Sequence, residues 1–217
     1  MHAIFFEPPL ENNFIEHQLV EIYLDKIYQP VFRDKKDLTI LDVGAFIGLT
    51  SYYFSRFAKV VYAFEPSLAY FDLLSRMLVF NEIKNVLPFR LALYLENNQF
   101  PFYHSKLNHT VSSLNAVVNV DNQSSEIVET TTLDKFFTEQ KIEHVDLLKL
   151  DVEGSEIEIL SSQGFKKVAE RIDNLVIESH AWAGRHPNQL QEALKNNGYK
   201  VEPVPNIFNA TLWWAKR

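Results

Sequence analysis

The chain has 217 residues, of which 47% are hydrophobic and 23% charged, a balance typical of one globular domain with a substantial core. Its formal charge of -7 makes nucleic acid an unlikely main partner, because affinity for a phosphate backbone comes from Lys and Arg. It has no cysteine, which excludes disulfides, thiolate catalysis and cysteine-based zinc sites.

The N-terminal segment 1–37 is expected to be a helical extension. Residues 1–9 lack the basic start and long apolar run of a secretory signal. No stretch in the chain approaches the roughly 20 apolar residues of a membrane span. We therefore expect a cytoplasmic protein without a membrane span. Within the extension, residues 13–29 place apolar side chains at roughly helical spacing, which predicts an amphipathic helix packed across the domain.

Strands and helices alternate from Leu38 onward. Buried apolar runs predict strands at 38–43, 60–64 and 86–90, separated by helices at about 48–57 and 67–80. This order is the βαβαβ pattern of a parallel sheet.

Residues 98–104 and 110–118 alternate less regularly, so we expect short edge strands or an insertion near 95–125. The regular pattern then resumes. The later predicted elements are a strand at 127–132, a short helix from Leu133, a strand at 145–150, a helix after Gly154, a strand at 174–178, a helix at 187–197 and strands at 199–202 and 211–215. Together they predict a single α/β domain over 1–217, with a core at 38–217. Its seven-stranded sheet is mostly parallel with an antiparallel last strand, and helices cover both faces.

Gly44 and Gly48 lie at the turn after the first predicted strand. In an open α/β sheet, ligands bind beyond the carboxyl ends of the strands, and a glycine turn lets the backbone approach them. The same spacing also fits a tight contact between strand and helix without any ligand.

Glu65 ends the second predicted strand, roughly 20 residues beyond this turn, where dinucleotide-binding folds place an acid on ribose hydroxyls. Alternatively, it is a turn acid before Pro66 at the start of the next helix. A complete Gly-x-Gly-x-x-Gly pyrophosphate loop is absent, which disfavours a nucleotide-linked oxidoreductase and favours a nucleoside without phosphates. S-adenosylmethionine fits this description, and its ammonium group would suit Asp42 or a neighbouring carbonyl.

Three segments, 41–48, 63–66 and 146–156, resemble the FkbM-type S-adenosylmethionine-dependent methyltransferases. With 112–114 and 132–134, the resemblance extends from about Leu38 to Tyr199. It implies a Rossmann-like class I methyltransferase fold and methyl transfer to oxygen, often on a sugar or a natural-product hydroxyl. The chain departs from the family at Phe46, where Asn is usual, and at Met77. An RNA or protein methyltransferase and a cofactor-binding domain without catalysis are the alternatives.

The cofactor-binding positions that we expect follow the strand ends. They are Asp42, Gly44, Ala45, Phe46, Gly48, Glu65, Pro66, Ala92 and Asp151. The expected cofactor is S-adenosyl-L-methionine, and the expected partner is a small-molecule or sugar acceptor.

Asp151 and Glu153 are the first candidates for contacting the acceptor, although acids at this position also commonly cap a helix, here one beginning near Ser155. His180 and His109 are further candidates for accepting a proton, although a loop histidine is more often a surface or packing residue.

Lys149 shares a strand side with Asp151 and is expected to pair with a carboxylate. Asp151, Glu153, Glu178 and His180 have ligand types suited to a hard metal, but they come from two strands, so we assign no metal site. Four aromatic residues are candidates for an acceptor pocket, with one of the adjacent tryptophans expected in the core: Trp182, Phe208, Trp213 and Trp214.

Overall fold

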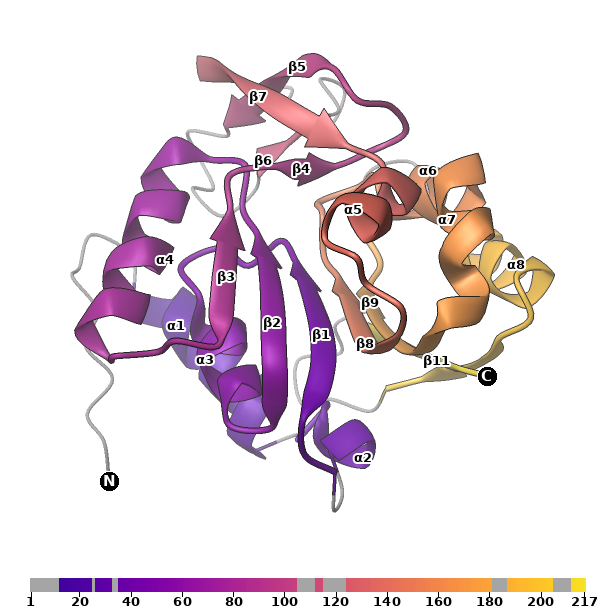
Figure 1. Ribbon diagram of the computed structural model, residues 1–217, viewed down its shortest axis with the longest axis horizontal. Helices are drawn as coiled ribbons and strands as arrows, with labels where there is room; N and C mark the ends of the chain where they lie inside the picture. The colour runs from indigo at the N-terminus through magenta and orange to yellow at the C-terminus, as the bar shows by residue number, and fades with distance from the viewer. Residues whose placement is uncertain are drawn as a thin grey trace.

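The computed structural model describes residues 12–24, 26–32, 35–104, 112–114, 124–180, 187–204 and 212–217. A seven-stranded sheet forms its centre, in the order β10-β11-β9-β8-β1-β2-β3 (Figure 1). The strands are β1 (Leu38–Val43), β2 (Ala58–Phe64), β3 (Val86–Phe89), β8 (Val145–Leu150), β9 (Ile172–Glu178), β10 (Lys200–Pro203) and β11 (Leu212–Lys216).

The last strand, β11, lies between β9 and β10 and is antiparallel to both. All other neighbouring strands of this sheet are parallel. The predicted seven-stranded, mostly parallel sheet with an antiparallel last strand is therefore confirmed.

Helices cover both faces of the sheet, as predicted (Figure 1). They are α1 (Asn12–Leu19), α3 (Leu49–Ser55) and α4 (Leu68–Phe80) on one side, and α5 (Leu133–Glu139), α6 (Glu156–Ser161), α7 (Gln163–Val168) and α8 (Pro187–Asn196) on the other, where the short 3-10 helix η2 (Ala169–Arg171) follows α7.

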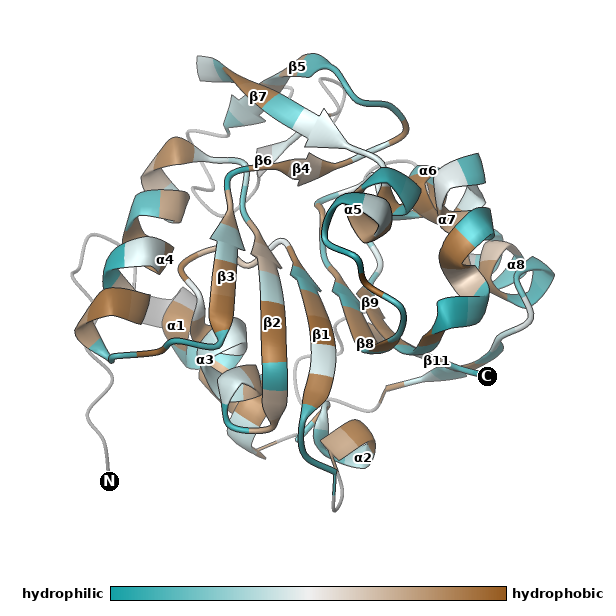
Figure 2. Ribbon diagram, viewed as in Figure 1, coloured by the Kyte–Doolittle hydropathy of each residue, from teal (hydrophilic) through white to brown (hydrophobic). Residues whose placement is uncertain are grey.

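Alternate residues of β1 point toward the two faces of the sheet. Leu41 belongs to the same hydrophobic core as Phe136 of α5, and Ile40 to the same core as Phe54 of α3. In Figure 2 the central strands are mainly hydrophobic, whereas the helices carry both hydrophobic and hydrophilic residues.

The N-terminal segment is not the single helix predicted over 13–29. Helix α1 continues as a π-helix, η1 (Val20–Leu24), and a separate short helix, α2 (Gln29–Phe32), follows. Lys26 has a left-handed backbone (φ 55°), which ends the first helix. Pro30 stands in the first turn of α2, where its missing N–H costs little. Tyr28 and its neighbours in this segment are buried against the face that carries α3.

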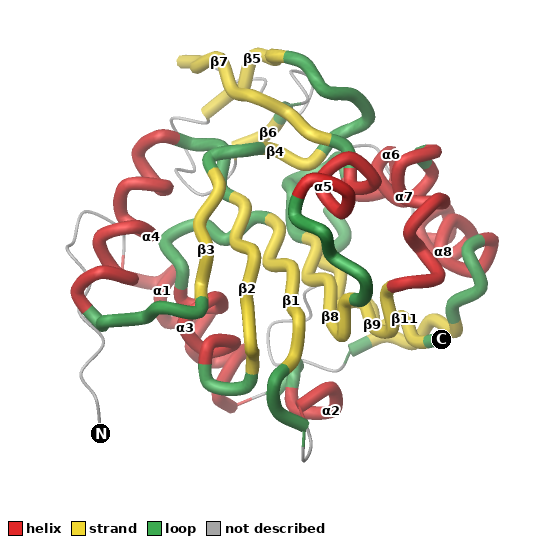
Figure 3. Tube along the Cα trace, viewed as in Figure 1, coloured by secondary structure: helices red, strands yellow, loops and turns green. Residues whose placement is uncertain are grey.

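A second, four-stranded sheet has the order β4-β7-β5-β6. Its strands are β4 (Ala92–Leu93), β5 (Gln99–His104), β6 (Ser112–Ser113) and β7 (Ser124–Thr131). It lies over the carboxyl ends of β1, β2 and β3 (Figures 1 and 3). The segment predicted as a strand at 127–132 belongs to this sheet. Among the described helices, none has the length and apolar character that crossing a membrane requires.

Candidate active site

A cavity opens at the carboxyl ends of β1, β2 and β8, beneath the second sheet. Six of the predicted cofactor positions line it: Gly44, Phe46, Glu65, Pro66, Ala92 and Asp151. Glu153 lines it as well, as do Gln18 of α1, Tyr70 of α4, Phe102 of β5 and Leu114, which follows β6. The site is therefore assembled from segments that are distant in the sequence, at the edge of the sheet where a parallel α/β fold binds ligands.

Gly44 allows a close approach between the loop after β1 and the end of β8. Its backbone is left-handed (φ 81°), and an added Cβ would lie 1.8 Å from the carbonyl oxygen of Asp151. Gly48 (φ 91°) is constrained differently, because an added Cβ would lie 2.4 Å from Cε of Met77. Gly48 does not line the cavity. The tight-packing interpretation of the glycine turn therefore applies to both glycines, and Gly44 in addition lines the cavity.

Phe46 also has a left-handed backbone, with a φ of 52°. Phenylalanine rarely adopts this conformation, whereas asparagine tolerates it, which gives a physical reason for the asparagine usual at this place in FkbM-type sequences. The Phe46 N–H donates to Oε2 of Glu65 at 2.9 Å, and its ring lies 4.4 Å from the Tyr70 ring between centroids. This ring pair forms an aromatic wall of the cavity.

Glu65 is buried, and each of its carboxylate oxygens accepts a backbone hydrogen bond. Oε2 accepts from Phe46 and Oε1 from Ser67, both at 2.9 Å. Burial raises its pKa to about 7, even though the two hydrogen bonds act in the opposite direction. Ser67 precedes α4, so Glu65 does organise the start of this helix. Each oxygen retains a second lone pair, so a donor in the cavity can still reach the carboxylate.

Asp42 does not reach the cavity. Its side chain is fully buried, and its Oδ2 accepts a hydrogen bond from the Ser51 hydroxyl at 2.5 Å. Burial raises its pKa above the ordinary value. The expected direct contact between Asp42 and the cofactor ammonium is therefore wrong for this geometry. Ala45 is also buried and outside the cavity lining, and its N–H donates to the carbonyl of Phe64 at 2.8 Å.

Lys149 of β8 lies between buried Asp42 and Asp151, which lines the cavity. Its Nζ donates to the carbonyl of Gly44 at 2.7 Å and lies 3.5 Å from Oδ1 of Asp42 and 3.2 Å from Oδ2 of Asp151. Burial disfavours the ammonium charge, but Asp151 and Asp42 more than compensate, so its pKa is raised. The predicted pairing of Lys149 with a strand-tip carboxylate is confirmed.

His180, just beyond β9, lies among four carboxylates. Its Nδ1 is 2.8 Å from Oε1 of Glu156. Its Nε2 is 3.3 Å from Oε2 of Glu153, 3.8 Å from Oδ1 of Asp151 and 4.0 Å from Oε1 of Glu178. The carboxyl ends of β8 and β9 thus bring together Asp151, Glu153, Glu178 and His180, the four residues whose side chains are of types suited to a metal ion.

These groups perturb one another strongly. Burial alone would lower the pKa of His180, but the hydrogen bond to Glu156 and the surrounding carboxylates raise it to about 10. Burial raises the pKa of Glu153 and Glu178 to about 8, with repulsion from Asp151 adding to it. In the absence of a bound cation, these carboxylates favour the protonated form of His180. The role of His180 as a proton acceptor stays a prediction.

The start of α6 tests whether Asp151 and Glu153 are helix caps. The side chain that accepts hydrogen bonds there is Glu156, whose Oε1 binds the N–H groups of Val152 at 3.3 Å and Gly154 at 3.1 Å. No capping bond from the side chain of Ser155 is present. Glu156 therefore holds the loop before α6 rather than capping the helix. Within this described segment neither Asp151 nor Glu153 makes a capping bond, and both line the cavity.

The remaining predicted site residues lie elsewhere. Trp214 is in the core, and its indole N–H donates to the carbonyl of Ile27 at 3.0 Å, as expected for one tryptophan of the pair. His109, Trp182 and Phe208 lie outside the described residues.

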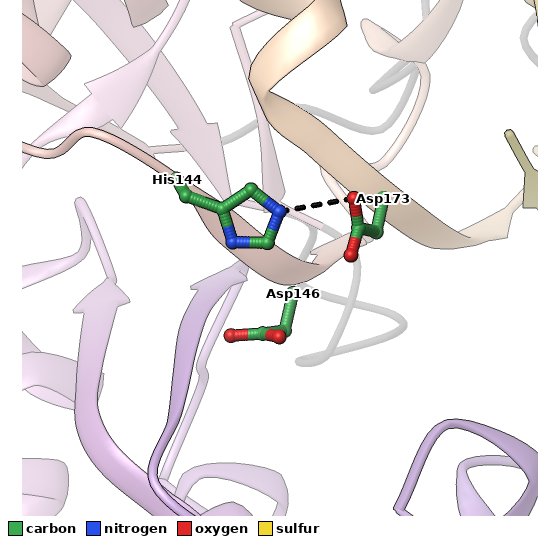
Figure 4. Close-up of side chains that lie close together, drawn as sticks. All are labelled: His144, Asp146 and Asp173. Carbon is green, nitrogen blue, oxygen red and sulfur yellow. Dashed lines mark ion pairs between the residues drawn. The ribbon is translucent and has the colours of Figure 1, made fainter.

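A second cluster of metal-ligand types, His144, Asp146 and Asp173, lies at the opposite, amino-terminal end of β8 and β9 (Figure 4). His144 Nε2 is 3.0 Å from Oδ1 of Asp173, and Oδ2 of Asp146 accepts from the Thr39 N–H at 2.9 Å. The side chains of His144 and Asp173 are about half exposed, at 49% and 45%. The cluster is therefore a partly solvated group of polar side chains at the other end of the strands from the cavity.

Comparison with known proteins identifies the family. The model of the FkbM methyltransferase domain matches residues 42–209, most of the chain. The chain belongs to the FkbM methyltransferase family.

Its relatives include methyltransferase sdnD of Sordaria araneosa, which is 28% identical across 86% of this chain and 83% of that protein. Another is the hexuronic acid methyltransferase AglP of Haloferax volcanii, which is 27% identical across 77% of this chain and 66% of its own length.

Solved structures share the fold of this FkbM-family chain. Precorrin-6y C5,15-methyltransferase of Geobacter metallireducens superposes with a TM-score of 0.52 at 13% identity, covering 89% of this chain and 88% of that one. SMU.1697c of Streptococcus mutans, in complex with SAH, gives a TM-score of 0.50 at 16% identity, covering 91% and 96%. The fold is the Rossmann-like class I methyltransferase fold that the resemblance implied.

Proposed function

We propose that this FkbM-family methyltransferase uses S-adenosyl-L-methionine to methylate a hydroxyl group of a small molecule or a sugar, and that residues 1–217 form one domain for this purpose. The observation that carries the proposal is the cavity that Glu65, Asp151 and Glu153 line together. It combines an acid suited to ribose hydroxyls with carboxylates suited to an acceptor. SMU.1697c, of the same fold, is in complex with SAH (S-adenosylhomocysteine), and AglP is described as a hexuronic acid methyltransferase.

The cofactor side is formed by Glu65, Phe46 and Gly44. The Glu65 carboxylate would accept hydrogen bonds from ribose hydroxyls with the lone pairs that Phe46 and Ser67 do not use. Gly44, whose missing side chain makes room for the carbonyl of Asp151, would fix the loop backbone that borders the ligand. The Phe46–Tyr70 ring pair would pack against the nucleoside, since aromatic faces favour flat apolar groups.

The acceptor side is formed by Asp151 and Glu153. S-adenosylmethionine, when bound, supplies a methyl group on a cationic sulfur. The protein therefore has to align the acceptor oxygen and take up its proton. Asp151 is paired with Lys149, whereas the buried Oε2 of Glu153 accepts no hydrogen bond from a described residue. We assign the proton to Glu153, whose pKa, raised to about 8, makes its ionised form an effective base near neutral to mildly alkaline pH, and the orientation of the acceptor to Asp151.

Incubation with methyl-labelled S-adenosylmethionine tests this proposal. The acceptor panel contains neutral sugars, hexuronic acids and hydroxylated aromatic compounds, with RNA and protein as the alternative acceptors. We expect label on a small hydroxyl compound, and at least a hundredfold loss of rate in Glu153→Gln, in line with removal of a general base. Glu129→Gln, an exposed acid on β7, is the matched control. Label on RNA or protein alone would overturn the acceptor assignment.

A further inference from the structure

The tips of β8 and β9 form a compact set of potential metal ligands. Asp151, Glu178 and His180 each offer one ligand atom, and these atoms lie within 4.8 Å of one another. Two ligands bonded to one ion at roughly 2.1–2.2 Å can be separated by at most about 4.4 Å. A shift of a few tenths of an ångström would therefore let all three bind the same ion.

The orientation of His180 fits this use. Glu156, which lies behind the ring at the start of α6, holds Nδ1 at 2.8 Å. Nε2 consequently faces Asp151 and Glu178. A carboxylate that fixes one nitrogen of a histidine while the other faces the metal is the usual outer-sphere arrangement of metal-binding histidines. Asp151 divides its oxygens in a compatible way, with Oδ2 toward Lys149 and Oδ1 toward His180.

An independent observation concerns Glu153. Its Oε2 is buried, accepts no hydrogen bond from the described residues, and points toward the same place, 3.3 Å from Nε2 of His180. A buried carboxylate oxygen without a hydrogen-bond donor is costly unless a cation compensates it. Four carboxyl groups surround the one imidazole ring of His180, at 2.8–4.0 Å from its two nitrogens, which is more oxygen ligands than one ring can pair with.

We propose that Asp151, Glu178 and His180 bind a divalent first-row metal ion at the edge of the cavity, with Glu153 beside it. One imidazole nitrogen and several carboxylate oxygens suit Mn²⁺, Fe²⁺ or Zn²⁺ better than Mg²⁺, which prefers oxygen ligands alone. Asp151 also lines the cavity, so the ion would hold an acceptor oxygen there. This role in the reaction rests on the proposed function, whereas the binding of the ion does not.

The test is a titration of the EDTA-treated full chain with Mn²⁺, followed by electron paramagnetic resonance. We expect one ion per chain with a dissociation constant at or below roughly 100 µM. The spin-echo modulation of the bound ion should show a directly coordinated imidazole nitrogen. A site made of carboxylates alone would lack this modulation.

Two variants at the site and one at the second cluster locate the ion. Glu178→Gln should weaken binding at least tenfold, and His180→Gln should abolish the nitrogen modulation. His144→Gln, in the cluster at the opposite end of the same strands, should change neither. Circular dichroism confirms that each variant is folded, and Glu178→Gln, whose side chain is 32% exposed, keeps the test available if His180→Gln does not fold.

The proposal is overturned if no stoichiometric ion binds, or if the modulation persists in His180→Gln and disappears in His144→Gln. Binding of SAH in the presence of EDTA, measured separately, distinguishes this failure from failure of the proposed function. Metal binding without SAH binding would contradict only the proposed function, and SAH binding without metal binding would contradict only the metal site.

Discussion

Lys149 donates a hydrogen bond to the carbonyl oxygen of Gly44 at 2.7 Å, which fastens the middle of the sheet to the loop at the cavity. Lys149 is also the register partner of Asp42 on the neighbouring strand, so the two charges share one buried face. The loop geometry, the buried acid and the acceptor-side carboxylate Asp151 therefore depend on one ammonium group.

Lys149→Met is expected to lower the free energy of unfolding by about 3–5 kcal/mol, because it leaves Asp42 buried without a counter-charge. The double variant Asp42→Asn/Lys149→Met should recover part of this loss. Urea denaturation measures both. Lys167→Met is the control: its partner Asp134 is at 2.7 Å, but the lysine is 65% exposed, so the loss should stay below about 1 kcal/mol. Equal losses in the two lysine variants would contradict this account.

Gly44→Ala is expected to destabilise the protein by at least about 3 kcal/mol, because its Cβ would overlap the carbonyl of Asp151 and its φ is 81°. Gly198→Ala is the matched control, because Gly198 has a similar backbone conformation (φ 85°) but its added Cβ would lie 3.6 Å from Nη1 of Arg217, an ordinary contact distance. It should cost only about 1–2 kcal/mol. Thermal and urea unfolding of both variants give the comparison, and a Gly44→Ala protein as stable as Gly198→Ala would refute the close approach.

Phe46→Asn is expected to be more stable than Phe46→Ala by about 0.5–1 kcal/mol. Both variants lose the ring contact with Tyr70, but only asparagine tolerates the left-handed backbone at this position. The difference in urea midpoint at constant slope is the measurement. If alanine proves equal or better, the backbone at Phe46 is not strained.

SAH binding should weaken by about tenfold between pH 8 and pH 6, because Glu65, with a pKa of about 7, must be ionised to accept hydrogen bonds from ribose hydroxyls. The nearby charges act in opposite directions, since Lys149 lowers this pKa and Glu126 raises it. The stability of the unliganded protein depends on pH in the opposite sense. Because folding raises the pKa of Glu65 above its ordinary 4.5, its contribution to the free energy of unfolding is fully present below pH 4.5 and is lost as the pH rises through about 7.

Calorimetric titration at several pH values measures the affinity, with Glu65→Gln as the control. Gln cannot ionise, and its amide would face one of the backbone N–H groups of Phe46 and Ser67. The variant should bind SAH weakly at every pH. A wild-type affinity that is constant from pH 6 to pH 8 would show that the ionisation of Glu65 does not govern binding.

Much of the fold could be predicted from sequence because the central strands are buried on both faces. Such strands appear as mainly apolar runs with isolated polar residues, as in Leu38–Val43 and Val145–Leu150, and their alternation with helices indicates a parallel sheet. Glu65 and Gly44 could be predicted because they occur at strand ends. The burial of Asp42 could also have been predicted, because Asp42 lies on the same strand face as Ile40, which belongs to the core under α3.

The rest of the site depends on contacts between distant segments. Gln18, Phe102 and Leu114 reach the cavity only because α1 and the second sheet fold over the strand ends, and no local pattern marks them. The raised pKa of His180 follows from Glu156, Glu153 and Asp151, three residues of one segment that meets the end of β9 only in the folded chain. The break in the N-terminal helix depends on the left-handed conformation of Lys26, which lysine does not favour and its sequence context does not indicate.

The central claim is that this cavity binds S-adenosylmethionine through Glu65. Isothermal titration of the full chain with SAH tests it most directly, alongside Glu65→Ala. The account predicts one site per chain with a dissociation constant between about 1 µM and 1 mM, and a loss of at least tenfold in Glu65→Ala. Absence of binding by the folded wild-type chain at millimolar SAH, or equal binding by the variant, would contradict it.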